Sequence, residues 1–181
     1  MKRRHLKAVV AIEQQVFPSP WSLGLYLSEI AQGGTRAYYV ARYAGEVIGY
    51  AGLMVAVGEG HVTTIGVVPE WQRRGVGRLL LLTLARTAIE RGANSLTLEV
   101  RVTNTGAQAM YHEFGFAPAG IRKNYYAEVH EDAIVMWAHD IQSDEYARRL
   151  DVIAGRLGDL RTALPGASDL PGASEPPAAP A

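Results

Sequence analysis

The chain has 181 residues, of which 48% are hydrophobic and 20% are charged, so it is long enough for one globular domain with a sizeable core. Its formal net charge is zero, which argues against broad binding to nucleic acid or to a membrane surface. Cysteine is absent, so disulfides and thiolate metal sites are excluded.

Two helices are predicted at the start of the chain. Apolar residues between positions 5 and 17 mostly follow helical spacing, and Pro18 and Pro20 end that helix. Ser22 can cap a second helix, which Gly33-Gly34 ends.

The basic start of the chain could be mistaken for a signal peptide. Met1-Lys-Arg-Arg-His5 suits the first part of such a peptide, but Glu13-Gln-Gln15 interrupts the apolar segment that should follow. No apolar run is long enough for a transmembrane helix either. We therefore expect a cytoplasmic protein.

Three runs rich in β-branched and aromatic residues follow, at positions 36–43, 47–57 and 61–68. Residues 44–46 and 58–60 between them read as hairpin turns, which predicts antiparallel neighbours.

The third strand ends before Pro69, and Gln72-Arg-Arg-Gly-Val-Gly77 leads into a helix predicted at 77–91. The first N–H groups of a helix are unpaired and its dipole is positive there, which suits an anion. Gly75 and Gly77 carry no Cβ, so a phosphate can approach the backbone closely. The sequence therefore predicts a phosphate site, with a plain surface turn as the alternative.

Positive side chains flank these glycines: Arg73, Arg74 and Arg78 suit phosphate oxygens. The loop is not a P-loop, because no Gly-Lys-Ser/Thr follows it. It also lacks the third glycine of a dinucleotide-binding loop, since Leu80 stands at that position.

The second half of the domain alternates strands and helices: a strand at 95–101, a helix at about 105–114, and strands at 116–125 and 132–141. A helix joins the strands 61–68 and 95–101, so these two are predicted to be parallel in an otherwise mainly antiparallel sheet. The fold class is therefore α/β (α+β), with a mixed sheet and flanking helices.

Two segments follow the predicted domain of residues 1–141. Residues 142–162 are expected to form an amphipathic helix that packs on this domain. The tail 163–181 is rich in proline, alanine and glycine and is expected to be disordered.

The motif Gln-x-x-Gly-x-Gly after the strand end resembles the pyrophosphate loop of the GNAT acetyltransferases, which bind acetyl-CoA. Other segments resemble the RimI branch, which acetylates the N-terminal alanine of a small-subunit ribosomal protein. These segments are residues 12–14, 20–22, 98–101, 109–116, 122–126 and 131–134, together with Asn104. The element order over residues 5–141 also matches the GNAT fold, in which the two parallel strands splay apart.

The resemblance implies positions for acetyl-CoA. The pantetheine arm would pair with the backbone of Ile65, Gly66 and Val67, and the pyrophosphate would lie on the loop 73–78. This loop contributes Arg73, Arg74, Gly75, Val76, Gly77 and Arg78. Asn104 would hydrogen-bond the arm; a helix cap or turn residue is the alternative. Gly66 departs from the family, in which alanine is common, although a backbone contact should tolerate either residue.

The resemblance also implies a general base at Glu99 and a general acid at Tyr111. An α-amine with a pKa of about 7.7–8 needs only modest help from a carboxylate, and a phenol with a pKa of about 10 keeps its proton for the departing thiolate. The alternatives are a solvated strand carboxylate for Glu99 and core packing for Tyr111.

Four further features concern the site. Tyr125 and Tyr126 would shape a peptide slot or simply pack, and Glu59 is a second carboxylate or a turn residue. The backbone N–H near Val67 would hold the oxyanion, as the resemblance implies. The five histidines show no ligand spacing, so no metal is predicted.

The expected function is acetyl-CoA-dependent acetylation of the N-terminus of a protein, and the expected substrate is a ribosomal protein. The amine would attack the thioester directly. The alternatives are a GNAT that acetylates a lysine side chain or a small-molecule amine, and a non-catalytic CoA-binding docking module. No nucleic-acid or membrane partner is expected, and the oligomeric state stays open.

Overall fold

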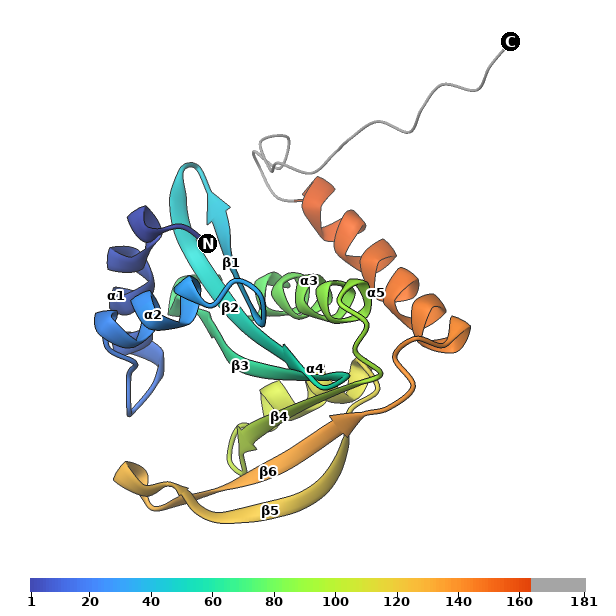
Figure 1. The fold of residues 1–181 in the computed structure, drawn as a ribbon. Coiled ribbons are helices and arrows are strands. Elements are labelled where there is room, and N and C mark those ends of the chain that lie inside the picture. The colour runs from blue at the N-terminus through green and yellow to red at the C-terminus, as the bar shows by residue number, and fades with distance from the viewer. Residues whose placement is uncertain (164–181) are drawn as a thin grey trace.

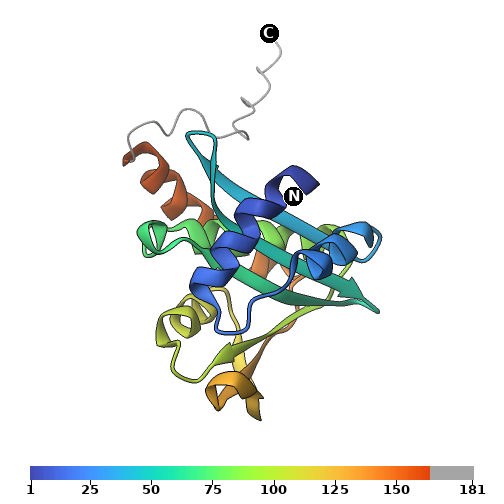
Figure 2. The same cartoon turned by 90° about the vertical axis from the view of Figure 1, so that its left-hand side faces the viewer.

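The structure, a computed structural model, describes residues 1–163. A single six-stranded sheet forms its centre, with the strand order β1-β2-β3-β4-β6-β5. Helices α1 and α2 lie on one face of this sheet, and α3, α4 and α5 lie on the other (Figures 1 and 2). The predicted fold class and the single parallel pair are confirmed.

Alternating side chains build the strands, and every neighbouring pair is antiparallel except β3 with β4. The strands are β1 (Arg36–Tyr43), β2 (Glu46–Ala56), β3 (Glu59–Val67), β4 (Ser95–Arg101), β5 (Ala117–Tyr126) and β6 (Glu131–Ala138).

Two expected boundaries are wrong by a few residues. The turn before β3 is made by Val57 and Gly58, both at positive φ, rather than by residues 58–60. Two residues of this kind form the tight turn that matches the twist of a hairpin. The last strand stops at Ala138 instead of continuing to 141, because Asp140 adopts a positive φ of 54° and turns the chain.

The parallel pair is short. Residues Glu59 to His61 of β3 pair with Ser95 to Thr97 of β4, and the ladder ends there. β3 continues alongside β2 to Val67, whereas β4 continues alongside β6 to Arg101. The two strands therefore splay apart, as the resemblance implied, and the part of β3 after His61 has one edge free of β4.

The helices α1 (Leu6–Val16) and α2 (Leu23–Ala31) follow a short 3-10 turn, η1 (Arg3–His5). The hydroxyl of Ser22 caps α2, as predicted, by accepting a hydrogen bond from the Leu25 N–H. Both helices cover β1–β3 through a small apolar cluster of Leu6, Val9, Ile12, Tyr26, Tyr38 and Tyr50.

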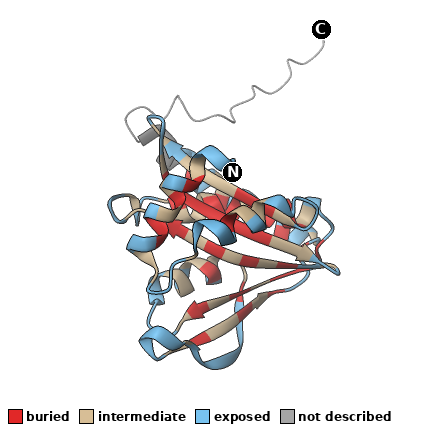
Figure 3. Ribbon diagram, turned by 60° about the vertical axis from the view of Figure 1, so that its left-hand side comes forward, coloured by how far each residue is buried: buried red, intermediate tan, exposed pale blue. Residues whose placement is uncertain are grey.

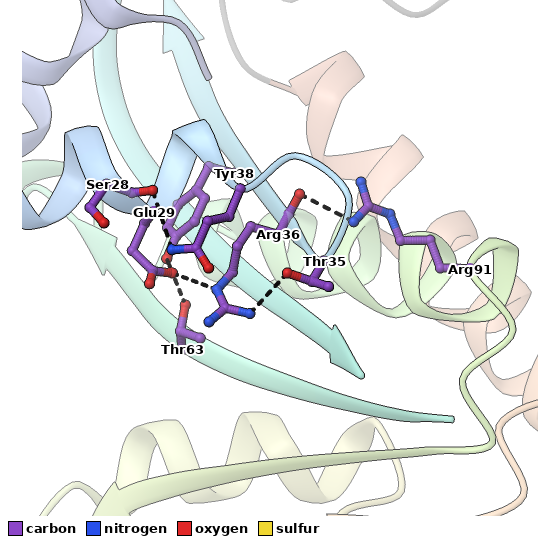
Figure 4. Close-up of polar contacts among 8 residues, drawn as sticks. Ser28, Glu29, Thr35, Arg36, Tyr38, Thr63 and Arg91 are labelled. Carbon is purple, nitrogen blue, oxygen red and sulfur yellow. Dashed lines mark hydrogen bonds and ion pairs between the residues drawn. The ribbon is translucent and has the colours of Figure 1, made fainter. Parts of the chain in front are cut away.

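One carboxylate ties α2 to the sheet (Figure 4). Glu29 Oε2 accepts hydrogen bonds from Arg36 Nε at 2.8 Å and from the Tyr38 hydroxyl at 2.7 Å. The Tyr38 hydroxyl also lies 3.3 Å from Thr63 Oγ1. Since Thr63 belongs to β3 just beyond the last residue paired with β4, this network holds the strand where the splay begins.

The opposite face of the sheet packs on α3 (Val76–Glu90), α4 (Thr105–Glu113) and α5 (Asp144–Ala163), around the large core coloured red in Figure 3. Helix α5 buries Tyr146, Leu150, Ile153 and Leu157 in this core. No helix among residues 1–163 is long and apolar enough to cross a membrane. The predicted tail lies outside the described residues from position 164 onward.

Candidate functional site

A cavity of about 900 Å³ runs through the gap between the splayed strands. One end is lined by the segment between α1 and α2, the middle by β3 and β4, and the other end by the loop before α3 and by the start of α4. The predicted phosphate loop and the predicted catalytic residues therefore lie along one continuous space.

The loop before α3 is held in shape by its own side chains. After the turn η2 (Pro69–Trp71), the Gln72 side chain donates a hydrogen bond to the Val67 carbonyl at 3.0 Å, which fastens the loop to the end of β3. Gly75 starts the helix with a φ of 85°, a conformation that glycine adopts without strain. A Cβ on Gly77 would lie 3.3 Å from Met110 Sδ of α4, so this glycine keeps the space between the two helices open.

The three arginines of the loop differ in position. Arg73 lines the cavity, and its Nη1 lies 3.5 Å from where a Cβ on Gly106 would stand, at the start of α4. The guanidinium of Arg74 lies over the Trp71 ring, 5.4 Å from its centroid. Arg78 lines the cavity but forms a double hydrogen bond with Glu113, with both distances 2.7 Å. We therefore expect Arg73 to meet a phosphate most directly.

The residues predicted to hold the pantetheine arm lie beside the gap. Ile65, Gly66 and Val67 of β3 line the cavity beyond the end of the β3–β4 ladder. Asn104 also lines it, and its side chain caps α4 by accepting the Ala107 N–H at 3.1 Å. Asn104 therefore caps a helix, the role given above as the alternative to cofactor binding.

The structure explains why a glycine occupies position 66, which the sequence did not reveal. A Cβ at this position would lie 2.5 Å from a ring carbon of Tyr50, which is fully buried against β3. The close approach of the aromatic ring explains why this chain has no side chain here.

Glu99 lies on β4, just after the last residue of the parallel pair. Its carboxylate contacts His61 Nε2 at 2.8 Å and Arg122 Nη2 at 3.2 Å, and its side chain is only 8% exposed. The hydrogen bond to His61 holds the pKa of Glu99 below its usual value, although burial opposes this shift. The side chain is therefore shielded from solvent, unlike the solvated strand carboxylate of the alternative, and it lines the cavity.

His61 is the residue that the sequence analysis missed. It was considered only as a metal ligand, whereas it hydrogen-bonds the predicted base and lines the same cavity. The sequence could have indicated this contact. Residues alternate between the two faces in the strands 61–68 and 95–101, and a parallel pair brings side chains from both strands to one face.

Tyr111 combines core packing with a position on the cavity, where a general acid would have to lie. It belongs to the large core, where its ring lies 5.9 Å from that of Phe116, and it also lines the cavity. Burial raises the pKa of its hydroxyl, with a smaller contribution from Tyr126. A phenol with a raised pKa keeps its proton at neutral pH, while the same shift makes it a weaker acid toward a thiolate.

Tyr125 and Tyr126 lie at the end of β5 and line the cavity beside Glu99. Burial raises the pKa of Tyr126 to about 12. Their rings meet edge to face, 5.2 Å apart, so they form one aromatic wall. Glu59, in contrast, lies at the exposed start of β3 and outside the cavity lining.

Two segments that are far apart in the sequence meet at the far rim of the cavity. Ser19, between α1 and α2, donates a hydrogen bond at 3.0 Å to Oε1 of Glu128, which belongs to the 3-10 turn η3 (Ala127–Val129) after β5. Nearby, Glu13 is buried and accepts hydrogen bonds from the Tyr26 hydroxyl at 2.7 Å and from the Trp21 N–H at 3.2 Å. Within residues 1–163, no group of three or more His, Cys, Asp or Glu side chains could hold a metal ion.

Comparison with known proteins identifies the family to which this chain belongs. The model of the acetyltransferase (GNAT) family matches residues 6–116. The [ribosomal protein bS18]-alanine N-acetyltransferase of Escherichia coli K12 is 38% identical over 133 residues, which cover 72% of this chain and 88% of that protein. The N-alpha-acetyltransferase RimI of Mycobacterium tuberculosis is 36% identical over 142 residues, covering 75% and 87%.

A solved structure shows the same architecture. The crystal structure of the Escherichia coli ribosomal-protein-S18-alanine N-acetyltransferase superposes with a TM-score of 0.70 and 35% sequence identity. The match covers 77% of this chain and 90% of that one.

Proposed function

This chain belongs to the GNAT family and is an N-acetyltransferase that uses acetyl-CoA, and we propose that its acceptor is the N-terminal amine of a protein. More specifically, we propose the N-terminal alanine of the small-subunit ribosomal protein bS18, on which its relatives from Escherichia coli act by name. A ribosomal substrate implies that the enzyme works in the cytoplasm.

The observation that carries the proposal is the position of Glu99. An ionised carboxylate, shielded from solvent, stands where β3 and β4 part and faces a cavity that continues to the glycine-rich loop. An amine that enters from the rim would therefore meet a base beside the free edge of β3.

The chain offers groups for each part of acetyl-CoA. Gly75, Gly77 and the first N–H groups of α3 suit the pyrophosphate, with Arg73 beside them. The free edge of β3 at Ile65–Val67 supplies N–H and C=O groups for the amides of the pantetheine arm.

Two side chains divide the proton transfers. Glu99 takes the proton that the acceptor amine loses as its nitrogen forms a bond to the acetyl carbon. Tyr111 gives its proton to the sulfur when the carbon–sulfur bond breaks. The N–H near Val67 would hold the oxyanion between these steps. The chain has no cysteine to carry the acetyl group, so the amine attacks directly.

The test is acetyl transfer to three peptides that share the first residues of bS18. The first has a free alanine N-terminus, the second a blocked N-terminus with an internal lysine, and the third a free N-terminus with a bulky first residue. We expect rapid transfer to the first peptide only. Faster transfer to the blocked peptide would replace the proposal with lysine acetylation.

A further inference from the structure

Two helices that flank the predicted pyrophosphate site are joined by one ion pair. Arg78 is the third residue of α3, and Glu113 is the last residue of α4. Nε and Nη2 of Arg78 each donate a hydrogen bond at 2.7 Å to the carboxylate of Glu113, one to each oxygen. A guanidinium and a carboxylate match in this double contact, which fixes the orientation of the guanidinium.

The two charges of this pair stabilise each other. The hydrogen bond with Glu113 raises the pKa of Arg78, and the hydrogen bond with Arg78 lowers the pKa of Glu113. The two side chains are 39% and 37% exposed. An ion pair this exposed contributes little to folding stability, so a substitution in it should leave the domain folded.

The pair leaves part of the guanidinium available to a ligand. Arg78 lines the cavity, whereas Glu113 does not. An arginine has five N–H groups, and Glu113 takes one on Nε and one on Nη2. The described side chains take no other N–H group of Arg78. Three N–H groups therefore remain for an anion, in an orientation that Glu113 sets.

The position of Arg78 suits the pyrophosphate of acetyl-CoA. It follows Gly77 directly, and a Cβ on Gly77 would lie 3.3 Å from Met110 Sδ of α4, so the space between the two helices is narrow here. The first N–H groups of α3 lie at the same end of the helix. An arginine that is held in place before the ligand arrives loses less side-chain freedom on binding, which favours affinity.

We propose that Glu113 is a positioning residue for acetyl-CoA: it holds Arg78 in the orientation in which the remaining N–H groups meet the pyrophosphate. This inference rests on the proposed function, which places the pyrophosphate at Gly75, Gly77 and the start of α3. The opposite role would be competition, in which Glu113 keeps Arg78 away from the phosphate. The two roles predict changes of opposite sign in affinity when the carboxylate is removed.

The first test is a double-mutant cycle on the affinity for acetyl-CoA, measured by titration calorimetry. Glu113→Gln should raise the dissociation constant roughly two- to tenfold, the range expected when one long side chain must be ordered on binding. Arg78→Ala should raise it by roughly tenfold or more, because hydrogen bonds to a charged group are lost. In the Arg78→Ala background, Glu113→Gln should have no further effect. Asp151→Asn, which removes the carboxylate that pairs with Arg86 of α3 outside the cavity lining, is the matched control and should bind as the wild type does.

A second measurement separates positioning from a general effect on the fold. Acetyl-pantetheine carries the thioester but lacks the pyrophosphate, so kcat/KM for this donor should be the same in Glu113→Gln and in the wild type. The KM for the acceptor peptide, and kcat at saturating acetyl-CoA, should also stay unchanged. The loss would then be confined to the binding of a donor that carries the pyrophosphate.

Each outcome decides the inference. Tighter binding of acetyl-CoA by Glu113→Gln would show competition and overturn positioning. Equal losses from Glu113→Gln and Arg78→Ala, or an equal loss with acetyl-pantetheine, would reduce the pair to a bridge between α3 and α4. Unchanged affinity in Glu113→Gln would overturn the inference and leave the proposed function standing, since the wild type still binds. A wild-type enzyme that does not bind acetyl-CoA would overturn the proposed function, and positioning with it.

Discussion

His61 Nε2 lies 2.8 Å from Glu99 Oε2, across the point where the parallel strands β3 and β4 part. The histidine offsets the unfavourable burial of the carboxylate, so Glu99 is ionised and ready to accept a proton at neutral pH.

His61→Ala should shift the pH profile of kcat/KM. Without this hydrogen bond, burial of the carboxylate remains, so the pKa of Glu99 rises. A base must be ionised to act, and the acid limb of the profile therefore moves to higher pH. We expect a loss of kcat/KM on the acid side of the profile that shrinks as the pH rises, with Arg122 still holding part of the pKa shift. His112→Ala, at an exposed position of α4, is the control; a uniform loss at all pH values would contradict the assignment.

Tyr111→Phe should lower kcat by roughly a hundredfold, as expected for the loss of a general acid, while the affinity for acetyl-CoA stays the same. The ring and its packing on Phe116 are kept, so the loss reports the hydroxyl alone. Tyr146→Phe removes a buried hydroxyl from α5, outside the cavity lining, and should have no effect on kcat. Full activity of Tyr111→Phe would leave this tyrosine with packing as its only role.

Gly77→Val should weaken acetyl-CoA binding by more than about tenfold, or 1.4 kcal/mol, in titration calorimetry. The branched side chain would enter the space between α3 and Met110, where we place the pyrophosphate. Gly77 is a better test position than Gly75, whose positive φ would strain any substitution. Gly155→Ala on α5, where a Cβ meets no other atom within 4 Å, should bind as the wild type does. Equal affinities would move the pyrophosphate elsewhere.

Arg73→Ala should reduce acetyl-CoA affinity more than Arg74→Ala does. Arg73 lines the cavity, whereas Arg74 stacks on Trp71. A charge-assisted hydrogen bond contributes about 1.5–3 kcal/mol, so we expect a loss of roughly tenfold or more for Arg73 and only a few-fold for Arg74. The ratio of the two dissociation constants is the measurement, and the reverse order would exchange the two roles.

Leu150→Ala should destabilise the domain by about 2–5 kcal/mol, because the side chain is 3% exposed in the core between α5 and α3. Val152 is two residues away on the same helix but 56% exposed, and Val152→Ala should change the stability by about 0.5 kcal/mol or less. Denaturant unfolding measures both. Equal small effects would show that α5 contributes little to the fold.

Local patterns were enough to predict most of the fold. Alternation identified the strands, Ser22 marked the start of α2, and the helix between two strands required a parallel pair. The turn before β3 was misplaced because Val57 adopts a positive φ, which is rare for a β-branched residue.

The contacts within the site were harder to predict. Glu99 and His61 are 38 positions apart, and Arg78 and Glu113 are 35 apart, so only the strand register and helix packing bring each pair together. The Glu113 partner of Arg78 is invisible to local spacing.

The ring of Tyr50 against Gly66 has an evolutionary consequence. An alanine in place of Gly66 would put its methyl group 2.5 Å from the ring. Neither position can therefore change freely while the other stays the same. Across homologues, we expect the two positions to co-vary, with alanine accompanied by a smaller or displaced side chain opposite it. The order of substitutions along a lineage would then be constrained, with the tyrosine reduced in size before the glycine acquires its methyl group.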